Sequence, residues 1–140
     1  MTAGQRSERG FVAVEWVAAV GLLLLPMAVV VLSFPAWVER QGMARSAAEE
    51  AARAVALAGD TEAGVAAGEA LVDEIARNHG IDPATMSVRF EGDVVRGGEV
   101  RAVVTVELPA LRFPGMGSVG AVEWSTSHTE LVDQYRGFEP

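Results

Sequence analysis

Hydrophobic and polar positions are distributed very unevenly along this chain. From Trp16 to Val38, 23 consecutive residues carry no charged side chain. As an α-helix this stretch is about 35 Å long, against a bilayer hydrocarbon core of roughly 30 Å. A helix that is apolar on every side cannot easily be enclosed by a domain of about 100 residues. The pattern therefore predicts a transmembrane helix, with the membrane span at about residues 11–38.

The helical pattern continues beyond the span, through an alanine-rich stretch over residues 36–58. Arg45, Glu49 and Arg53 recur every four residues, a spacing that stacks them on one face and predicts a ladder of ion pairs. The opposite face carries small apolar side chains that recur with the helical period, namely Met43, Ala47, Ala51, Ala54 and Ala58. We expect one continuous helix from about residue 11 to residue 58.

This helix contains two prolines, Pro26 in the middle of the span and Pro35 near its outer end. Proline removes a backbone donor and crowds the preceding turn of a helix. We therefore expect a bend at each of the two positions.

The remaining pattern predicts a short helix followed by strands. Gly59 and Asp60 end the long helix, and residues 61–79 have the apolar spacing of an amphipathic helix. After Pro83 the period changes to two, which predicts three strands at 86–91, 99–108 and 121–133. Residues 92–98 suit a hairpin turn, and residues 109–118 form a longer Pro/Gly loop.

These elements predict an α+β fold, in which the short helix and the outer half of the long helix cover one face of a three-stranded antiparallel sheet. The predicted organisation is a polar leader at residues 1–10, the N-terminal helix at 11–58, and an extracytoplasmic helix and β-meander at 59–140.

Charge sets the expected orientation and excludes one class of partner. Arg6 and Arg9 precede the span, whereas Glu39 and Arg40 roughly cancel after it. The positive-inside rule therefore places the N-terminus in the cytoplasm and the C-terminal part outside. The net charge of −8 argues against nucleic-acid binding, which needs a basic surplus.

No group of residues predicts catalysis, a cofactor or a metal ion. The chain has no cysteine, and its two histidines, His79 and His128, are far apart in the sequence. The adjacent acids Glu49–Glu50 and Asp73–Glu74 point about 100° apart on a helix, so neither pair suits a catalytic dyad. We expect a protein that is not an enzyme.

The unusual feature lies before the span, where Gly10 and Phe11 are followed by Glu15 inside apolar sequence. Glycine lets a backbone enter a protease active site in extended form without a side-chain clash. A cut after Gly10 would remove the basic leader and create a positively charged amine on Phe11, one helical turn from Glu15. The alternative is an ordinary interfacial acid, which is tolerated near the edge of a bilayer.

The pattern of Gly10, Phe11 and Glu15 before an unbroken apolar helix resembles the class III signal peptide (leader) of type IV pilins and pseudopilins. The resemblance implies that a prepilin peptidase cuts between Gly10 and Phe11. It also implies that Glu15 pairs with the N-terminal amine of a neighbouring subunit during assembly.

Within that group the chain is most similar to the TadE/TadG-like proteins of tight-adherence (Tad/Flp) pilus systems. The similarity is carried by four stretches: RGFVAVEWVAAVGLLLLP, QGMARSAAEEAARAVA, VTVELPALRFPG and SHTELVDQYR. One departure is Trp16, where phenylalanine is usual in the family. The resemblance implies a pilin-like fold and a pseudopilin or minor pilin whose partners are the prepilin peptidase, other pilins, the pilus assembly platform and membrane lipid.

A second reading remains open, in which the chain is a signal-anchored extracytoplasmic binding module. In that case the helix only tethers the sheet, and the N-terminus stays uncut. The two readings differ in the first residue of the mature chain.

Overall fold

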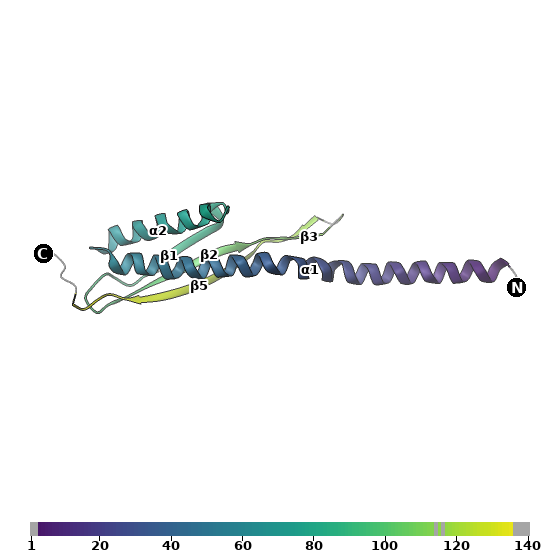
Figure 1. The fold of residues 1–140 in the computed structure, drawn as a ribbon, viewed down its shortest axis with the longest axis horizontal. Helices are drawn as coiled ribbons and strands as arrows, with labels where there is room; N and C mark the ends of the chain where they lie inside the picture. The colour runs from purple at the N-terminus through teal and green to yellow at the C-terminus, as the bar shows by residue number, and fades with distance from the viewer. Residues whose placement is uncertain (1–2, 114, 116, 136–140) are drawn as a thin grey trace. The chain divides into compact units, whose positions relative to one another are not determined.

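The computed structural model describes residues 3–113, 115 and 117–135, and it describes side chains from residue 12 onward except that of Ala13. In chain order the elements are α1 (Ala3–Leu57), α2 (Thr61–Asn78), the 3-10 turn η1 (Pro83–Thr85), β1 (Met86–Glu91), β2 (Glu99–Leu108), β3 (Leu111–Phe113), β4 (Gly117–Val119) and β5 (Val122–Leu131) (Figure 1). They form two compact units. One contains the chain up to residue 35 together with residues 110–120, and the other contains residues 36–109 and the chain from residue 121 onward.

Helix α1 is continuous over Ala3–Leu57 and passes through both prolines without interruption. It begins eight residues before the predicted start at Phe11, so the prediction of the helix start is wrong. Gly10 is the only weak helix former at that point, and one glycine costs about 1 kcal/mol in a helix, too little to end it. The helix ends at Leu57, one residue before the predicted end. The predicted bends at Pro26 and Pro35 stay predictions.

The first unit also contains a small antiparallel pair of strands, β3 and β4, that the sequence did not predict. Leu111 pairs with Val119, and Phe113 pairs with Gly117. Both strands lie in the stretch that we expected to be a loop. They are only three residues long, too short for an alternating pattern to be recognised.

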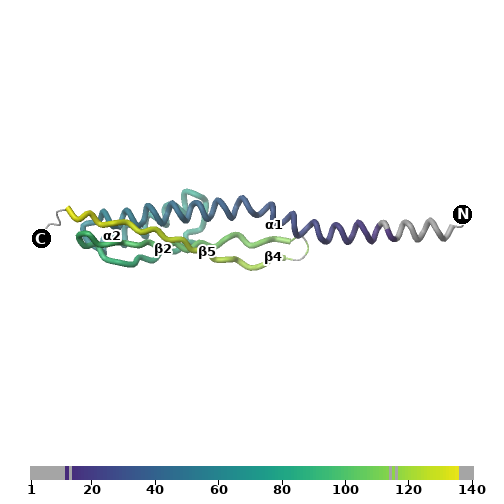
Figure 2. Tube along the Cα trace, turned by 90° about the horizontal axis from the view of Figure 1, so that it is seen from below, coloured from purple at the N-terminus to yellow at the C-terminus, as the bar shows by residue number. Residues whose placement is uncertain are grey.

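The second unit has the predicted arrangement of an antiparallel three-stranded sheet with helices on one face. Its strand order is β1-β2-β5. Figures 1 and 2 show α2 and the outer part of α1 on the same side of this sheet. One buried cluster joins the three parts, with Ala44, Ala47, Ala48 and Ala51 from α1, Val72 and Ala76 from α2, and Ala102, Val104 and Val106 from β2. The coarse prediction of an α+β fold is therefore confirmed.

Small side chains allow the helices of this unit to pack closely. On α1 the alanines Ala44, Ala47, Ala48, Ala51 and Ala52 are buried, and on α2 Gly64 and Gly68 are buried as well. Asp60 caps α2, because its carboxylate accepts a hydrogen bond from the Ala63 N–H at 2.8 Å.

The predicted ladder of Arg45, Glu49 and Arg53 is wrong. Among the described side chains, no salt bridge joins these three residues. Instead the Arg45 guanidinium lies over the Trp124 ring of β5, 5.7 Å from its centroid. A cation over an aromatic ring competes well with an exposed ion pair, because exposed pairs contribute roughly 0–1 kcal/mol.

Candidate functional site

Over residues 14–34, helix α1 presents mostly apolar side chains on all its sides. The exposed large side chains in this part include Val14, Trp16, Val17, Leu22, Leu23, Leu24, Met27, Val31, Leu32 and Phe34. By length and composition α1 is suited to cross a membrane, and the most apolar window of its described residues contains no buried residue. A helix in the core of a soluble domain would be mostly buried. An apolar surface of this extent suits contact with lipid or other apolar helices, as in a membrane anchor or a signal sequence.

Glu15 interrupts that surface. Its side chain is exposed and lines a shallow hollow together with Val12, Trp16 and Ala19. These residues are spaced three and four apart, so they share one face of the helix. Among the described side chains none forms a salt bridge or hydrogen bond with Glu15. A carboxylate in an apolar setting without a partner is costly.

Gly10 and Phe11 lie in α1 by their backbone, while the side chain of Phe11 is not among those that the structure describes. Phe11 precedes Glu15 by four residues, a helical rise of about 6 Å. A positive charge on the backbone nitrogen of residue 11 would therefore lie one turn from the Glu15 carboxylate. The described structure places the three predicted residues on one helix, and cleavage between Gly10 and Phe11 stays a prediction.

The prolines leave two backbone carbonyls of α1, those of Leu22 and Val31, without their usual helical donors. Nearby, the Ser33 hydroxyl donates to the Val29 carbonyl oxygen at 2.8 Å. Such bonds from serine to the carbonyl four residues earlier often accompany bent helices. If the helix lies in lipid, the two free carbonyls need donors from neighbouring helices or water.

A hydrogen bond marks the boundary between the apolar helix and the folded unit. The Trp37 indole N–H donates to the Pro109 carbonyl oxygen at 3.0 Å, and an Arg40 nitrogen lies 3.5 Å from the Glu107 carbonyl oxygen. The sequence did not predict this contact. No pattern in the sequence connects positions 72 residues apart.

The outer face of the sheet is polar, and its side chains largely satisfy one another. Arg89 contacts Glu91 at 3.0 Å, and Arg101 donates to the Ser127 hydroxyl at 2.8 Å. A shallow depression lies between them, lined by Arg89, Glu91, Arg101, Val103, Ser125, Thr126 and Ser127. This face resembles an ordinary solvated sheet surface.

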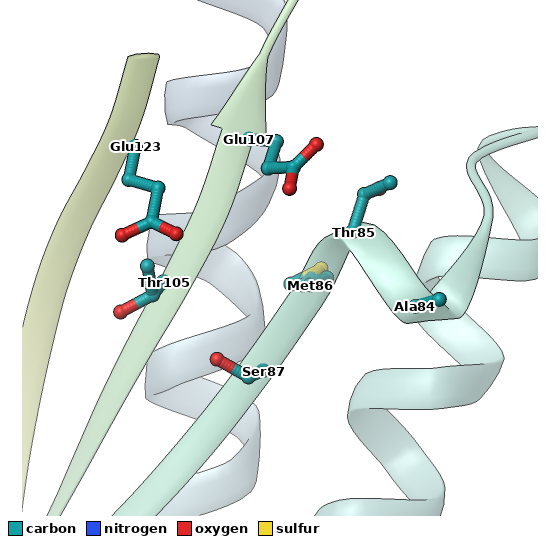
Figure 3. A pocket seen from close by; sticks show the side chains of 7 residues that line it. All are labelled: Ala84, Thr85, Met86, Ser87, Thr105, Glu107 and Glu123. Carbon is teal, nitrogen blue, oxygen red and sulfur yellow. The ribbon is translucent and has the colours of Figure 1, made fainter. Parts of the chain in front are cut away.

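A second, smaller hollow lies where β1, β2 and β5 meet η1 (Figure 3). Glu107 and Glu123 lie directly opposite each other on neighbouring strands at its rim. Its volume of about 70 Å³ is far below the roughly 300–1,000 Å³ of typical ligand pockets. Within the part of the chain that the structure describes, no three His, Asp or Glu residues are grouped in a way that suits a metal ion.

Comparisons of the chain with family models, curated proteins and solved structures give no match. The functional argument therefore depends on the residues themselves, and above all on Glu15 and the apolar surface around it.

Proposed function

We propose that this protein is a pseudopilin or minor pilin, similar to the TadE/TadG-like proteins of tight-adherence pilus systems. In this proposal a prepilin peptidase cuts between Gly10 and Phe11, and the subunit assembles through the N-terminal half of α1. The observation that carries the proposal is the exposed carboxylate of Glu15 on an otherwise apolar helix surface without a partner among the described side chains.

A carboxylate in that position favours assembly with a neighbouring helix that carries a cation at a similar depth. The amine that cleavage creates on Phe11 lies at the same depth of the helix in every copy of the chain. Glu15 lies about 6 Å further along the helix, so two adjacent helices that are offset by about one turn can place the amine of one beside Glu15 of the other. Because removing one member of a buried ion pair costs about 3–5 kcal/mol, the pair would enforce one relative register of the two helices.

The second unit fits the role of a folded head on the far side of the membrane. Its buried core joins the outer part of α1 to the sheet, so the membrane helix and the head share one continuous element. The proposed location is a single-pass membrane protein with its N-terminus in the cytoplasm, which enters the pilus when assembly proceeds. Its proposed partners are the prepilin peptidase, other pilins and the assembly platform.

Replacement of the acid tests the pairing. We expect Glu15→Gln to insert in the membrane as the parent chain does, because the change removes a charge from an apolar segment. Its amount in sheared pili should fall at least tenfold, because the neighbour's amine loses its partner. The measurement is the ratio of pilus-associated to membrane-associated protein in cells with the full assembly system.

The matched control is Glu50→Gln, an exposed acid of α1 in the second unit. It removes the same charge from the same helix outside the apolar segment, and its pilus fraction should remain at the parental level. A parental pilus fraction for Glu15→Gln would contradict the pairing mechanism.

The alternative function is a signal-anchored extracytoplasmic binding module, for which the shallow polar depression on the outer sheet face is the favouring observation. This alternative needs no cleavage after Gly10 and no neighbour for Glu15. It predicts that the mature chain retains residues before Phe11.

A further inference from the structure

The β3–β4 hairpin is an unexplained part of the fold. Strands this short do not form a stable two-stranded ribbon in water by themselves. Its residues belong to the same compact unit as the chain up to residue 35, which is the apolar part of α1. The hairpin therefore needs a surface other than the three-stranded sheet to stabilise it.

The two faces of the hairpin differ in polarity. Leu111 and Phe113 alternate with Arg112 along β3, so the two apolar side chains share one face. Leu111 pairs with Val119, which extends this apolar face onto β4, and Arg112 pairs with Ser118 on the other face. Val119 is 59% exposed, whereas Leu111 and Phe113 are half-buried.

The segment that contains the hairpin also differs from the rest of the chain in its lack of acidic residues. From Leu108 to Val122, 15 residues contain one arginine, Arg112, and no acidic residue, in a chain with 19 acids. Acids flank the segment on both sides, Glu107 before it and Glu123 after it. These two glutamates lie opposite each other on β2 and β5, so the acid-free segment begins and ends at the same position along the sheet.

Pro109, which precedes the hairpin in the chain, lies beside Trp37, near the end of the apolar segment of α1. Val100, near the start of β2, belongs to the same buried cluster as Val55, whereas Pro109, after the end of β2, accepts the hydrogen bond from Trp37. Strand β2 therefore runs back along α1 toward the apolar segment. Figure 2 shows the chain passing from β2 into the hairpin before it returns as β5. The six residues that follow Pro109 reach at most about 20 Å, so no part of β3 lies farther than that from Pro109.

We propose that the β3–β4 hairpin is a second membrane contact, which lays its apolar face into the outer interface of the bilayer. The occupant of this face is lipid, and Arg112 on the opposite face suits the phosphate groups at that depth. The contact fixes the height of the folded head above the membrane. This inference rests on the proposed membrane location of α1, but it does not depend on cleavage or on Glu15.

Site-directed spin labelling of the full chain in lipid nanodiscs tests the contact. The chain has no cysteine, so every introduced cysteine is labelled uniquely. The test site is Phe113→Cys, and Val119→Cys is a second site on the same face. Leu24→Cys in the apolar part of α1 is the lipid reference, and the exposed Thr129→Cys on β5 is the water reference. Circular dichroism checks that each variant keeps the helix and sheet content of the parent.

The readout is the ratio of collision rates with oxygen, which enters lipid, and with a water-soluble nickel complex. We expect the ratios at Phe113→Cys and Val119→Cys to exceed that at Thr129→Cys several-fold and to approach that at Leu24→Cys. Ratios equal to the water reference at both hairpin sites, with Leu24→Cys in lipid, would overturn the hairpin contact and leave the proposed function intact. A water-like ratio at Leu24→Cys would overturn the membrane location and the hairpin contact together.

Discussion

At the scale of single residues, the account depends on a charge whose partner is made by processing. In the proposed function Glu15 pairs with a cation, and no described side chain forms a salt bridge with it. The proposed cation is the amine that follows removal of residues 1–10. In this account Gly10 is the residue before the cleavage site, where the absence of a side chain lets the extended backbone enter the protease.

A substitution at Gly10 tests that role. We expect Gly10→Leu to block cleavage by a co-expressed prepilin peptidase, because a branched side chain would clash where glycine lets the extended backbone enter the protease. The measurement is the ratio of uncleaved to cleaved protein on a gel. The control is Gly21→Ala, which lies in the same helix beyond the cut site and has open space around its added methyl group. Normal processing of Gly10→Leu would contradict the assignment of Gly10.

At the scale of elements, the regular parts of the fold followed from periodicity. The observed bounds of β1 and β2 equal the predicted ones, since strict alternation over Met86–Glu91 and Glu99–Leu108 leaves one register that buries the apolar side chains. Strand β5 is three residues shorter than predicted. Its core-facing side carries Thr126, His128 and Glu130, which are only half-buried, so burial does not define its ends as sharply.

Contacts between distant segments were not predictable from the sequence. Arg45 has acids at helical spacing, yet it lies over Trp124, because the fold brings a ring from β5 to that position. The hairpin was missed for a different reason, since LRFPGMGSV reads as a loop at the level of periodicity. For the candidate site the reverse holds. Glu15 was found from the sequence alone, and the structure added that its surroundings are exposed and apolar.

The packing of α2 on α1 gives a stability prediction at this scale. A methyl group added at Gly64 would lie 2.9 Å from the Ala58 side chain and 3.1 Å from the Val55 backbone. We expect Gly64→Ala to lower the free energy of unfolding by about 1–3 kcal/mol, because neighbouring backbone cannot move aside easily. The measurement is chemical denaturation of the full chain in detergent, followed by circular dichroism.

The matched control for that substitution is Gly42→Ala on α1. Nothing lies within 4 Å of its added methyl group, so the same change gains helix propensity without a clash. It should raise stability by about 0.5–1 kcal/mol. If both variants had equal stability, the close approach of the two helices at Gly64 would be refuted.

At the scale of the whole molecule, the two units divide the work of the proposed subunit. The first contains the exposed apolar helix and the hairpin, which lipid or neighbouring subunits cover in the proposed function. The second has a buried core of its own and a polar outer face. This organisation agrees with the proposed assembly in a membrane.

The most direct measurement is mass spectrometry that identifies the first residue of the mature protein. The full chain is expressed once together with a prepilin peptidase and once without it. With the peptidase, the account predicts a chain that begins at Phe11. Without it, residues 1–10 should remain. A chain that keeps residues before Phe11 in the presence of an active peptidase would contradict the account and favour the anchored binding module.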